Sequence, residues 1–245
     1  MIFPADGKIA LLVAISGLFF PGFTFMAFAQ TNAVGSKMSA DQVVDRLEQA
    51  SRQRAEDLKH YSGTRTYRLE YHGLGSLSAE MVVEVQYDAP GKKQFRVISE
   101  KGSKLIRDKV FKKLLQSEEE AANPDAQRQT ALSRENYKFE LAGDEVLHGR
   151  HCYVLAVAPH KASKFLYKGK VWIDGEDFAT VQIEAQPAVN PSFWIRHTAI
   201  HHEYAKFGEF WLPLRNRSTS NIRMGGTATL TIDYGKYVIS PTAPN

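Results

Sequence analysis

Residues 195–237 read IRHTAIHHEYAKFGEFWLPLRNRSTSNIRMGGTATLTIDYGKY and decide the fold. This stretch contains three long strand-like runs, over 195–207, 210–222 and 227–237. Gly208-Glu209 separates the first two runs, and Gly225-Gly226 separates the last two. Because strands joined by such short turns pair antiparallel, the stretch predicts three neighbouring antiparallel strands.

The same pattern extends toward the N-terminus. Alternating apolar and polar residues predict further strands near 67–71, 81–87, 94–98, 152–158, 165–174 and 178–185, and Tyr137, Phe139 and Leu141 alternate as well. Amphipathic spacing predicts helices over 39–59 and 107–120, and the polar stretch 124–134 reads as a short helix or a loop. We count about nine strands, with turns at Gly143-Asp144 and His148-Gly149. Since alternating crossover helices are missing, we predict a mainly β (α+β) fold with one curved antiparallel sheet covered by helices.

Residues 1–29 are expected to be a signal peptide. Lys8 precedes an uncharged apolar run over 9–20, and Pro21-Gly22 then breaks any helix. The small residues of Ala27-Phe28-Ala29 suit a signal peptidase. No cysteine lies near this site, so we expect no lipid-modified N-terminus.

The alternative is a retained membrane anchor over 9–29, which is long enough to span a bilayer. Cleavage would leave a flexible leader over 30–38 and a single domain over 39–240, exported and free to diffuse. The lone cysteine of the chain, Cys152, cannot form an intramolecular disulfide and lies in a strand-like run, so we expect it in the core.

The net charge of +4 has a local source. Between residues 92 and 113 the only acidic residues are Glu100 and Asp108. The basic residues of this stretch are Lys92, Lys93, Arg96, Lys101, Lys104, Arg107, Lys109, Lys112 and Lys113. In an exported protein, such a patch favours anionic lipid head groups or an acidic partner over nucleic acid. A solvated face is an equally good interpretation.

Motifs for catalysis or cofactor binding are missing. The sequence has no G-x-x-x-x-G-K loop, no G-x-S-x-G elbow and no H-E-x-x-H pair, so we expect a non-enzyme with no catalytic residue and no cofactor. His197, His201 and Glu203 share a strand face, but positions 197 and 201 are about 13 Å apart on an extended strand, too far for one tetrahedral zinc ion.

A cluster of acidic residues, Asp174, Glu176 and Asp177, marks a hairpin turn. Calcium binding is one interpretation of such a cluster, and an ordinary turn is the favoured one. We therefore expect no metal site in either place.

Many apolar residues fall on the strand face that the alternation marks as inward. They could form a plain core, or they could line a cavity for an apolar ligand, because both use the same residues. The candidate ligand-binding residues are Tyr67, Leu69, Met81, Val83, Val85, Phe95, Val97, Phe111 and Leu114.

Two motifs carry a family resemblance. Residues 149–159 fit the pattern G-x-x-C-Y-x-L-x-V-x-P, and residues 171–178 fit V-W-I-D-x-x-D-F. Trp211-Leu212-Pro213 then begins a strand. Together they resemble the outer-membrane lipoprotein-sorting superfamily of LolA-, LolB- and RseB-like proteins. The chain resembles soluble LolA and RseB more than membrane-anchored LolB, since it lacks a lipobox.

The resemblance implies an incomplete β-barrel with a helical lid. It implies a periplasmic, non-enzymatic carrier or sensor of lipids or lipoproteins, with acyl chains as ligands and an inner-membrane exporter or transporter as a partner. It also implies an arginine that holds the lid, for which Arg65 and Arg68 are the candidates. The alternative function is a structural or protein-interaction module with a filled core, which uses its basic patch to contact a partner.

Overall fold

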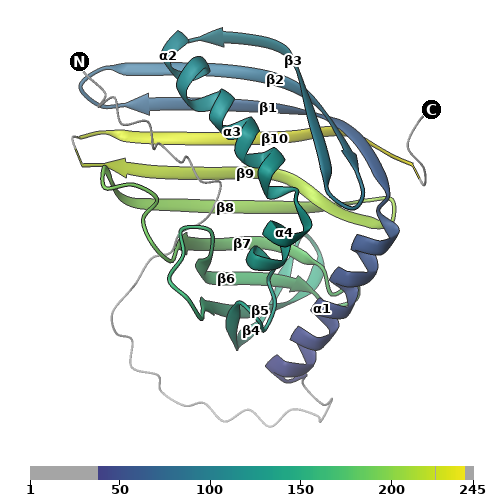
Figure 1. Cartoon of the computed structure of the whole chain (residues 1–245). Helices are drawn as coiled ribbons and strands as arrows, with labels where there is room; N and C mark the ends of the chain where they lie inside the picture. Colours follow the sequence, from purple (N-terminus) through teal and green to yellow (C-terminus); the bar gives the residue numbers. More distant parts are fainter. Residues whose placement is uncertain (1–37, 224, 241–245) are drawn as a thin grey trace.

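The computed structural model describes residues 38–223 and 225–240 (Figure 1). The expected signal peptide, 1–29, and all but the last residue of the expected leader, 30–38, lie outside the described residues.

The described chain begins with helix α1 (Ala40–Asp57). Ser39 caps it: the Ser39 hydroxyl accepts from the Gln42 backbone N–H at 3.2 Å, and the Gln42 side chain accepts from the Ser39 N–H at 2.8 Å. This reciprocal capping satisfies two of the N–H groups that a helix start leaves free. Buried Val43, Val44 and Leu47 form the apolar stripe of α1. The helix predicted over 39–59 is therefore confirmed.

Ten strands form one antiparallel sheet among the described residues, one more than the nine that we count from the sequence. They are β1 (His60–His72), β2 (Ser76–Asp88), β3 (Lys92–Gly102), β4 (Tyr137–Leu147), β5 (Arg150–Pro159), β6 (Tyr167–Asp174), β7 (Thr180–Pro187), β8 (Ile195–Phe207), β9 (Phe210–Ile222) and β10 (Thr227–Ser240). The bounds predicted for the strands over 195–207 and 210–222 are those observed. The turn predicted at Gly143-Asp144 is wrong, because β4 continues through Gly143 with a bulge after Leu141.

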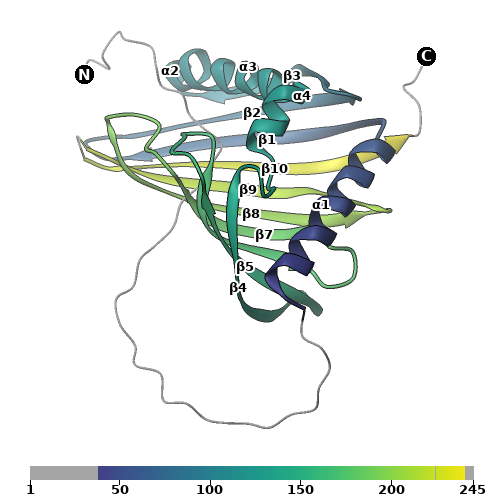
Figure 2. The same ribbon diagram turned by 60° about the horizontal axis from the view of Figure 1, so that its bottom comes forward.

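The strand order is β3-β2-β1-β10-β9-β8-β7-β6-β5-β4. The first strand therefore lies in the middle of the sheet beside the last one. The edge strands β3 and β4 do not pair with each other, so the sheet is curved and open rather than closed (Figures 1 and 2).

A second helical segment leaves the end of β3. It consists of α2 (Lys104–Ile106), the π-helical turn η1 (Arg107–Phe111) and α3 (Lys112–Ala121), and α4 (Pro124–Thr130) follows. The helix predicted over 107–120 is therefore present, with a π-helical turn at its beginning, and the stretch 124–134 begins as a short helix. We call residues 104–121 the helical cover, because Figures 1 and 2 show this segment lying over the β1–β3 side of the sheet.

The sheet has one inner face, which both α1 and the helical cover contact. A single cross-strand row crosses this face from β4 to β2. Its members, in order, are Leu141, Leu155, Val171, Ile183, His202, Asn216, Ile232, Tyr67 and Met81. The row is apolar or aromatic except at His202 and Asn216, which separate two apolar clusters.

One cluster packs α1 against β4–β8, and the other packs the helical cover against β1, β2 and β10. A smaller third cluster, on the outer face, contains Cys152, Val154, Trp172 and Val181. Cys152 is buried there, as expected, and burial raises the pKa of its thiol.

Candidate functional site

The candidate site is the apolar surface beneath the helical cover. Seven of the nine residues predicted to bind a ligand are buried. Six of the seven, all but Val85, belong to the cluster that also contains Ile106, Leu230 and Ile232. The seven are Tyr67, Leu69, Met81, Val83, Val85, Phe111 and Leu114. Phe111 and Leu114 project from the helices onto the strand residues, so the predicted set comes together at the interface between sheet and helix.

The other two predicted residues differ. Phe95 on β3 is only partly buried against this cluster. Val97 is 45% exposed, so it is not buried in the interface as Met81 and Val83 are. Its register partner is Val83, so Val97 shares the inner face but lies on the edge strand β3, which has only one neighbouring strand. A bulge at Ile98, where Val82 pairs with Ser99 and Val83 with Val97, interrupts the alternation of β3 just beyond it.

A buried polar group joins the sheet to the helical cover. Arg65 of β1 is 3% exposed and donates to the Glu118 carboxylate of α3. The hydroxyl of Tyr67, two residues further along the same strand face, donates to the other Glu118 oxygen at 2.8 Å. Lys93 Nζ lies 3.9 Å from the carboxylate. We call the contacts of Arg65 and Tyr67 with Glu118 the latch.

Aromatic rings surround the latch arginine. The Arg65 guanidinium lies 4.7 Å from the centre of the Tyr234 ring and 5.5 Å from that of Phe95. Rings at this distance stabilise a cation that has lost its water. Burial is the largest single effect and acts to lower the pKa of Arg65, but the Glu118 carboxylate and the neighbouring tyrosine hydroxyls together outweigh it and hold the pKa above its ordinary value. Burial, together with the charge of Arg65, lowers the pKa of Lys93 to about 8.

Arg68, the second candidate for the lid arginine, lies on the outer face of the sheet. It pairs there with Glu80 and Asp233, and nearly half of its side chain is exposed. The structure therefore separates the two candidates: Arg65 contacts the helical cover and Arg68 does not.

Glu118 was not singled out from the sequence, although a signal was present. The cover helix buries Phe111 and Leu114, and Glu118 follows Leu114 by four residues, on the same helix face. A carboxylate on an apolar helix stripe requires a partner. The alternation of β1 also places Arg65 on the same face as Tyr67 and Leu69. The sequence therefore contained grounds to predict that Arg65 pairs with Glu118.

The polar interruption of the inner face is the second feature of interest. His202 and Asn216 are register partners on β8 and β9, and both are buried. The Asn216 amide donates to the Tyr234 hydroxyl at 2.9 Å. Neither His202 Nε2 nor Asn216 Oδ1 has a hydrogen-bond partner among the described residues. Burial, with a smaller contribution from neighbouring His201, lowers the pKa of His202 to about 3, so its imidazole is neutral.

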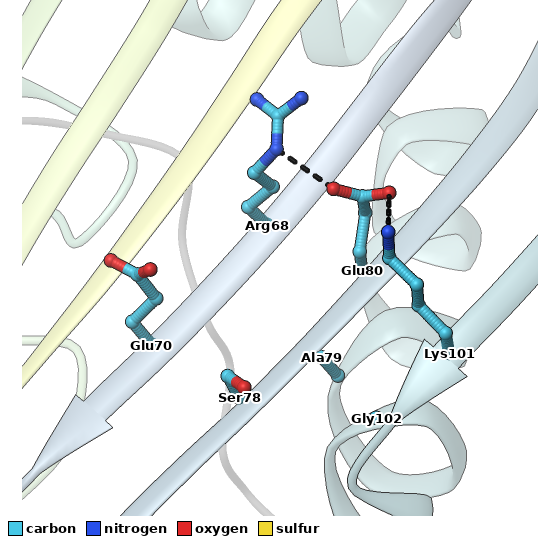
Figure 3. Close-up of a pocket in the computed structure, with 7 residues that line it drawn as sticks. All are labelled: Arg68, Glu70, Ser78, Ala79, Glu80, Lys101 and Gly102. Carbon is cyan, nitrogen blue, oxygen red and sulfur yellow. Dashed lines mark hydrogen bonds and ion pairs between the residues drawn. The ribbon is translucent and has the colours of Figure 1, made fainter.

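Two depressions lie outside the candidate site. One, of about 290 Å³, is lined by Arg68, Glu70, Ser78, Ala79, Glu80, Lys101 and Gly102 on the outer face (Figure 3). There Glu80 accepts from Arg68 at 2.9 Å and from Lys101 at 3.0 Å. The other, of about 720 Å³, lies between the β2–β3 turn and the α3–α4 connection. None of the nine predicted ligand-binding residues lines either depression.

The predicted basic stretch is largely paired with carboxylates. Ion pairs join five of its nine cations to acidic residues: Lys93 to Glu118, Arg96 to Glu84, Lys101 to Glu80, Arg107 to Glu100 and Lys112 to Asp108. The sequence showed an excess of cations because the neutralising carboxylates come mostly from β2 and α3.

The acidic cluster and the histidine cluster both make polar contacts with other side chains of the protein. His201 lies between Glu184, at 3.4 Å, and Glu203, at 3.0 Å. In the hairpin, Arg150 pairs with Asp174, Glu176 and Asp177, so these carboxylates have a cation from the protein itself. Within residues 38–223 and 225–240, no three His, Cys, Asp or Glu side chains are arranged to hold a metal ion.

No helix of the described part of the chain combines the length and the apolar character that crossing a membrane requires.

Comparison with known proteins gives structural likenesses only. No family model matches the chain, and no curated protein matches it significantly. A domain from Vibrio parahaemolyticus described as an outer membrane lipoprotein-sorting protein is similar, with 13% identity, a TM-score of 0.42, and coverage of 84% of this chain and 95% of that one. A DUF1329 family protein from Desulfovibrio piger has 13% identity and a TM-score of 0.45, over 85% of this chain and 96% of that one.

A LolA superfamily protein from Nitrosomonas europaea has 11% identity and a TM-score of 0.38, over 85% of this chain and 96% of that one. TM-scores of 0.38 to 0.45 mark a loose superposition, so the description of the fold depends on the strand order and register given above.

Proposed function

We propose that this protein is a periplasmic, non-enzymatic carrier or sensor that binds an acyl chain, of a lipoprotein or another lipid, on the inner face beneath the helical cover. The observation that supports this proposal most directly is the latch. Arg65 and Tyr67 contact Glu118 at the margin of an otherwise apolar interface, so one polar contact holds the helical cover over a continuous apolar surface.

The proposed binding step replaces helix side chains by ligand. Phe111 and Leu114 fill the space over Tyr67 and Met81 in the closed form. An acyl chain can take their place only when the helical cover moves outward, and its desolvation contributes ~0.8 kcal/mol per buried methylene. The π-helical turn η1 lies within the cover and supplies a point where the helix is irregular, as π-bulges do at functional sites.

The periplasmic location and an inner-membrane exporter or transporter as partner belong to the same proposal. They are supported by the signal-peptide pattern over residues 1–29 and by the resemblance of residues 149–178 to the lipoprotein-sorting superfamily. No catalytic step is included in the proposal.

A second candidate is a structural or protein-interaction module. The observation that favours it is the packing: Tyr67 and Phe111 are both fully buried, so the interface between sheet and helix is filled in the described structure. In this alternative, the helical cover is a permanent part of the core and never opens.

Ligand titration of delipidated protein distinguishes the two candidates. We expect saturable binding of a fluorescent fatty acid and of an acylated peptide. Glu118→Gln weakens the latch, so it should tighten the apparent affinity, by about tenfold for each ~1.4 kcal/mol that the closed form loses. Glu119→Gln is the matched control, because Glu119 is exposed on the same helix and should bind as the native protein does. Absence of saturable binding by the native protein and by Glu118→Gln would support the interaction module.

A further inference from the structure

The strand directions bring several connections together at one end of the sheet. β1, β5, β7 and β9 end there, and β2, β6, β8 and β10 begin there. This end therefore carries the connections 73–75, 160–166, 188–194 and 223–226, of which residue 224 lies outside the described residues. The β1–β2, β7–β8 and β9–β10 connections lie at the left of both ribbon views (Figures 1 and 2).

Hydrogen bonds join these connections into one surface. The Ala188 N–H donates to the Leu166 carbonyl at 2.9 Å, and the Arg223 N–H donates to the Trp194 carbonyl at 2.8 Å. The Tyr71 hydroxyl donates to the Gly225 carbonyl at 3.1 Å. The four connections are therefore neighbours rather than independent tips.

Large apolar side chains are exposed along this surface. Leu74 is 78% exposed, Phe193 is 73% exposed and Phe165 is 51% exposed. Trp194 and Val189 are exposed beside them. We call Leu74, Phe165, Val189, Phe193 and Trp194 the aromatic rim. Exposed side chains of this size on neighbouring connections require an explanation, because single exposed apolar residues are common but groups of them mark interaction sites.

Cations accompany the aromatic rim. The Lys164 ammonium lies 4.9 Å from the centre of the Phe165 ring, and the Arg223 guanidinium lies 5.0 Å from that of Phe193. Lys161 is exposed in the same connection as Lys164. The four connections contain no Asp or Glu. Lys161, Lys164 and Arg223 form no ion pair with any residue in the described part of the chain, in contrast to most cations of the stretch 92–113.

The opposite end of the sheet has a different character. It carries the acidic hairpin turn, with Asp174, Glu176 and Asp177, and Glu209 in the β8–β9 turn. Arg150 and Lys206 pair with the hairpin carboxylates, and at the rim end Glu135 is exposed just before β4, so the two ends differ chiefly in the exposed aromatic rings and the unpaired cations beside them.

We infer that the aromatic rim docks the protein on an anionic phospholipid bilayer. Aromatic rings that are apolar on one side and next to a cation on the other suit the boundary between lipid head groups and acyl chains. Cations near an anionic lipid surface each contribute to binding, and the four connections add no carboxylate that would oppose them. The inference does not depend on acyl-chain binding beneath the helical cover, since the aromatic rim shares no residue with that site.

Vesicle sedimentation tests the docking surface. We expect the full chain to sediment with vesicles of phosphatidylglycerol and phosphatidylcholine, to do so less at high salt, and to remain in solution with phosphatidylcholine alone. Lys161→Gln with Lys164→Gln should lower the partition coefficient roughly 25-fold, at about fivefold for each cation. Phe193→Ser with Trp194→Ser should abolish sedimentation.

Matched controls lie at the opposite end. Lys59→Gln with Lys92→Gln makes the same charge change with exposed lysines, and Val146→Ser with Val238→Ser removes exposed apolar residues from β4 and β10. Both double variants should sediment as the native chain does. Tryptophan emission should shift to the blue with anionic vesicles, and Trp194→Phe should remove that shift.

Three results would overturn the inference. They are no sedimentation of the native chain, an equal loss in rim and control variants, and a dimer in sedimentation velocity that Phe193→Ser with Trp194→Ser dissociates. The last result would assign the aromatic rim to a second copy of this chain. Fatty-acid titration without vesicles tests the proposed function separately. A protein that does not bind vesicles could therefore still bind an acyl chain, and the reverse also holds.

Discussion

Arg65 of β1 and Glu118 of α3 are 53 residues apart in the chain and form an ion pair inside the interface between sheet and helical cover. The side chains are 4% and 15% exposed, so neither charge is well hydrated. A pair of this kind is costly to break, because the partner that remains is a buried charge.

Single and double substitutions at this pair should therefore differ. Glu118→Ala should lower the free energy of unfolding by ~3–5 kcal/mol, since it leaves Arg65 uncompensated. Arg65→Met combined with Glu118→Leu should cost much less than the sum of the single variants. Urea denaturation gives both values. Arg68→Ala, on the exposed outer pair, serves as the control and should cost less than about 1 kcal/mol. If the double variant lost as much free energy of unfolding as the two single variants together, Arg65 and Glu118 would not be energetically coupled.

Phe111 and Val97 form a second contrast, because both are candidate ligand residues but only Phe111 is buried. Phe111→Ala should destabilise the protein by ~3–5 kcal/mol through loss of packing and the cavity that remains. Val97→Ala should change the free energy of unfolding by less than about 0.5 kcal/mol. Thermal unfolding followed by circular dichroism measures both. Similar costs at the two positions would mean that Val97 is buried in solution.

His202 should make stability depend on pH. Its pKa is lowered from 6.5 to about 3 in the folded protein, so below pH 6.5 the unfolded chain binds a proton that the folded chain does not. The free energy of unfolding therefore falls as the pH decreases from 6.5 toward 3, by up to ~1.4 kcal/mol per pH unit.

The variant His202→Gln lacks this titration. We compare the free energy of unfolding of His202→Gln with that of the native protein at two pH values. Between neutral pH and about pH 5, this difference should shift in favour of the variant by ~2 kcal/mol. His201→Gln, at the half-exposed neighbour, is the control and should show a smaller change. A histidine resonance of His202 that titrates near pH 6.5 in the folded protein would contradict the burial of a neutral imidazole.

The hairpin carboxylates give a fourth prediction. Asp174 is fully buried; burial opposes its ionisation, but the Arg150 guanidinium and two backbone N–H groups lower the pKa of Asp174 below 3.8. Its contribution to stability is present above that value and is lost as the pH falls through the lowered folded-state pKa. Arg150→Ala should cost ~2–3 kcal/mol at neutral pH and less in acid. Lys206→Ala, at a more exposed pair with Asp177, should cost less than about 1 kcal/mol.

Calcium provides a direct check of the same hairpin. Because Arg150 already pairs with all three carboxylates, calcium should leave the unfolding midpoint of the native protein unchanged. A rise in the midpoint with calcium, abolished by Asp174→Asn, would show that the turn binds the ion instead.

Much of the fold could be predicted from local patterns. Alternation and turn residues predicted the strands over 195–207 and 210–222 with their observed bounds, and Ser39 with an apolar stripe predicted α1. These features depend on neighbours in sequence, so one sequence contains them. The error at Gly143 comes from a bulge, which depends on the partner strand, and the exposure of Val97 follows from its place on an edge strand.

The candidate site was predicted in part. The apolar residues of β1, β2 and the cover were identified because burial follows the strand and helix periods. The pairing of Arg65 with Glu118, the neutralisation of the basic stretch and the neighbouring connections of the aromatic rim were not predicted. Each of them joins segments that are far apart in sequence, and the strand order that brings them together is a property of the whole sheet.

The position of β1 beside β10 also determines how the chain can fold. Within β1–β3 and within β4–β10, every strand pairs with the strand that precedes or follows it in the sequence. The two blocks are joined by the pairing of β1 with β10, which runs from His60 opposite Ser240 to His72 opposite Thr227. That junction joins the strands that are furthest apart in the sequence, so its formation has the largest entropic cost of loop closure in the sheet. A chain truncated before β10 would leave β1 and β9 as two exposed edges, and exposed edges are templates for aggregation.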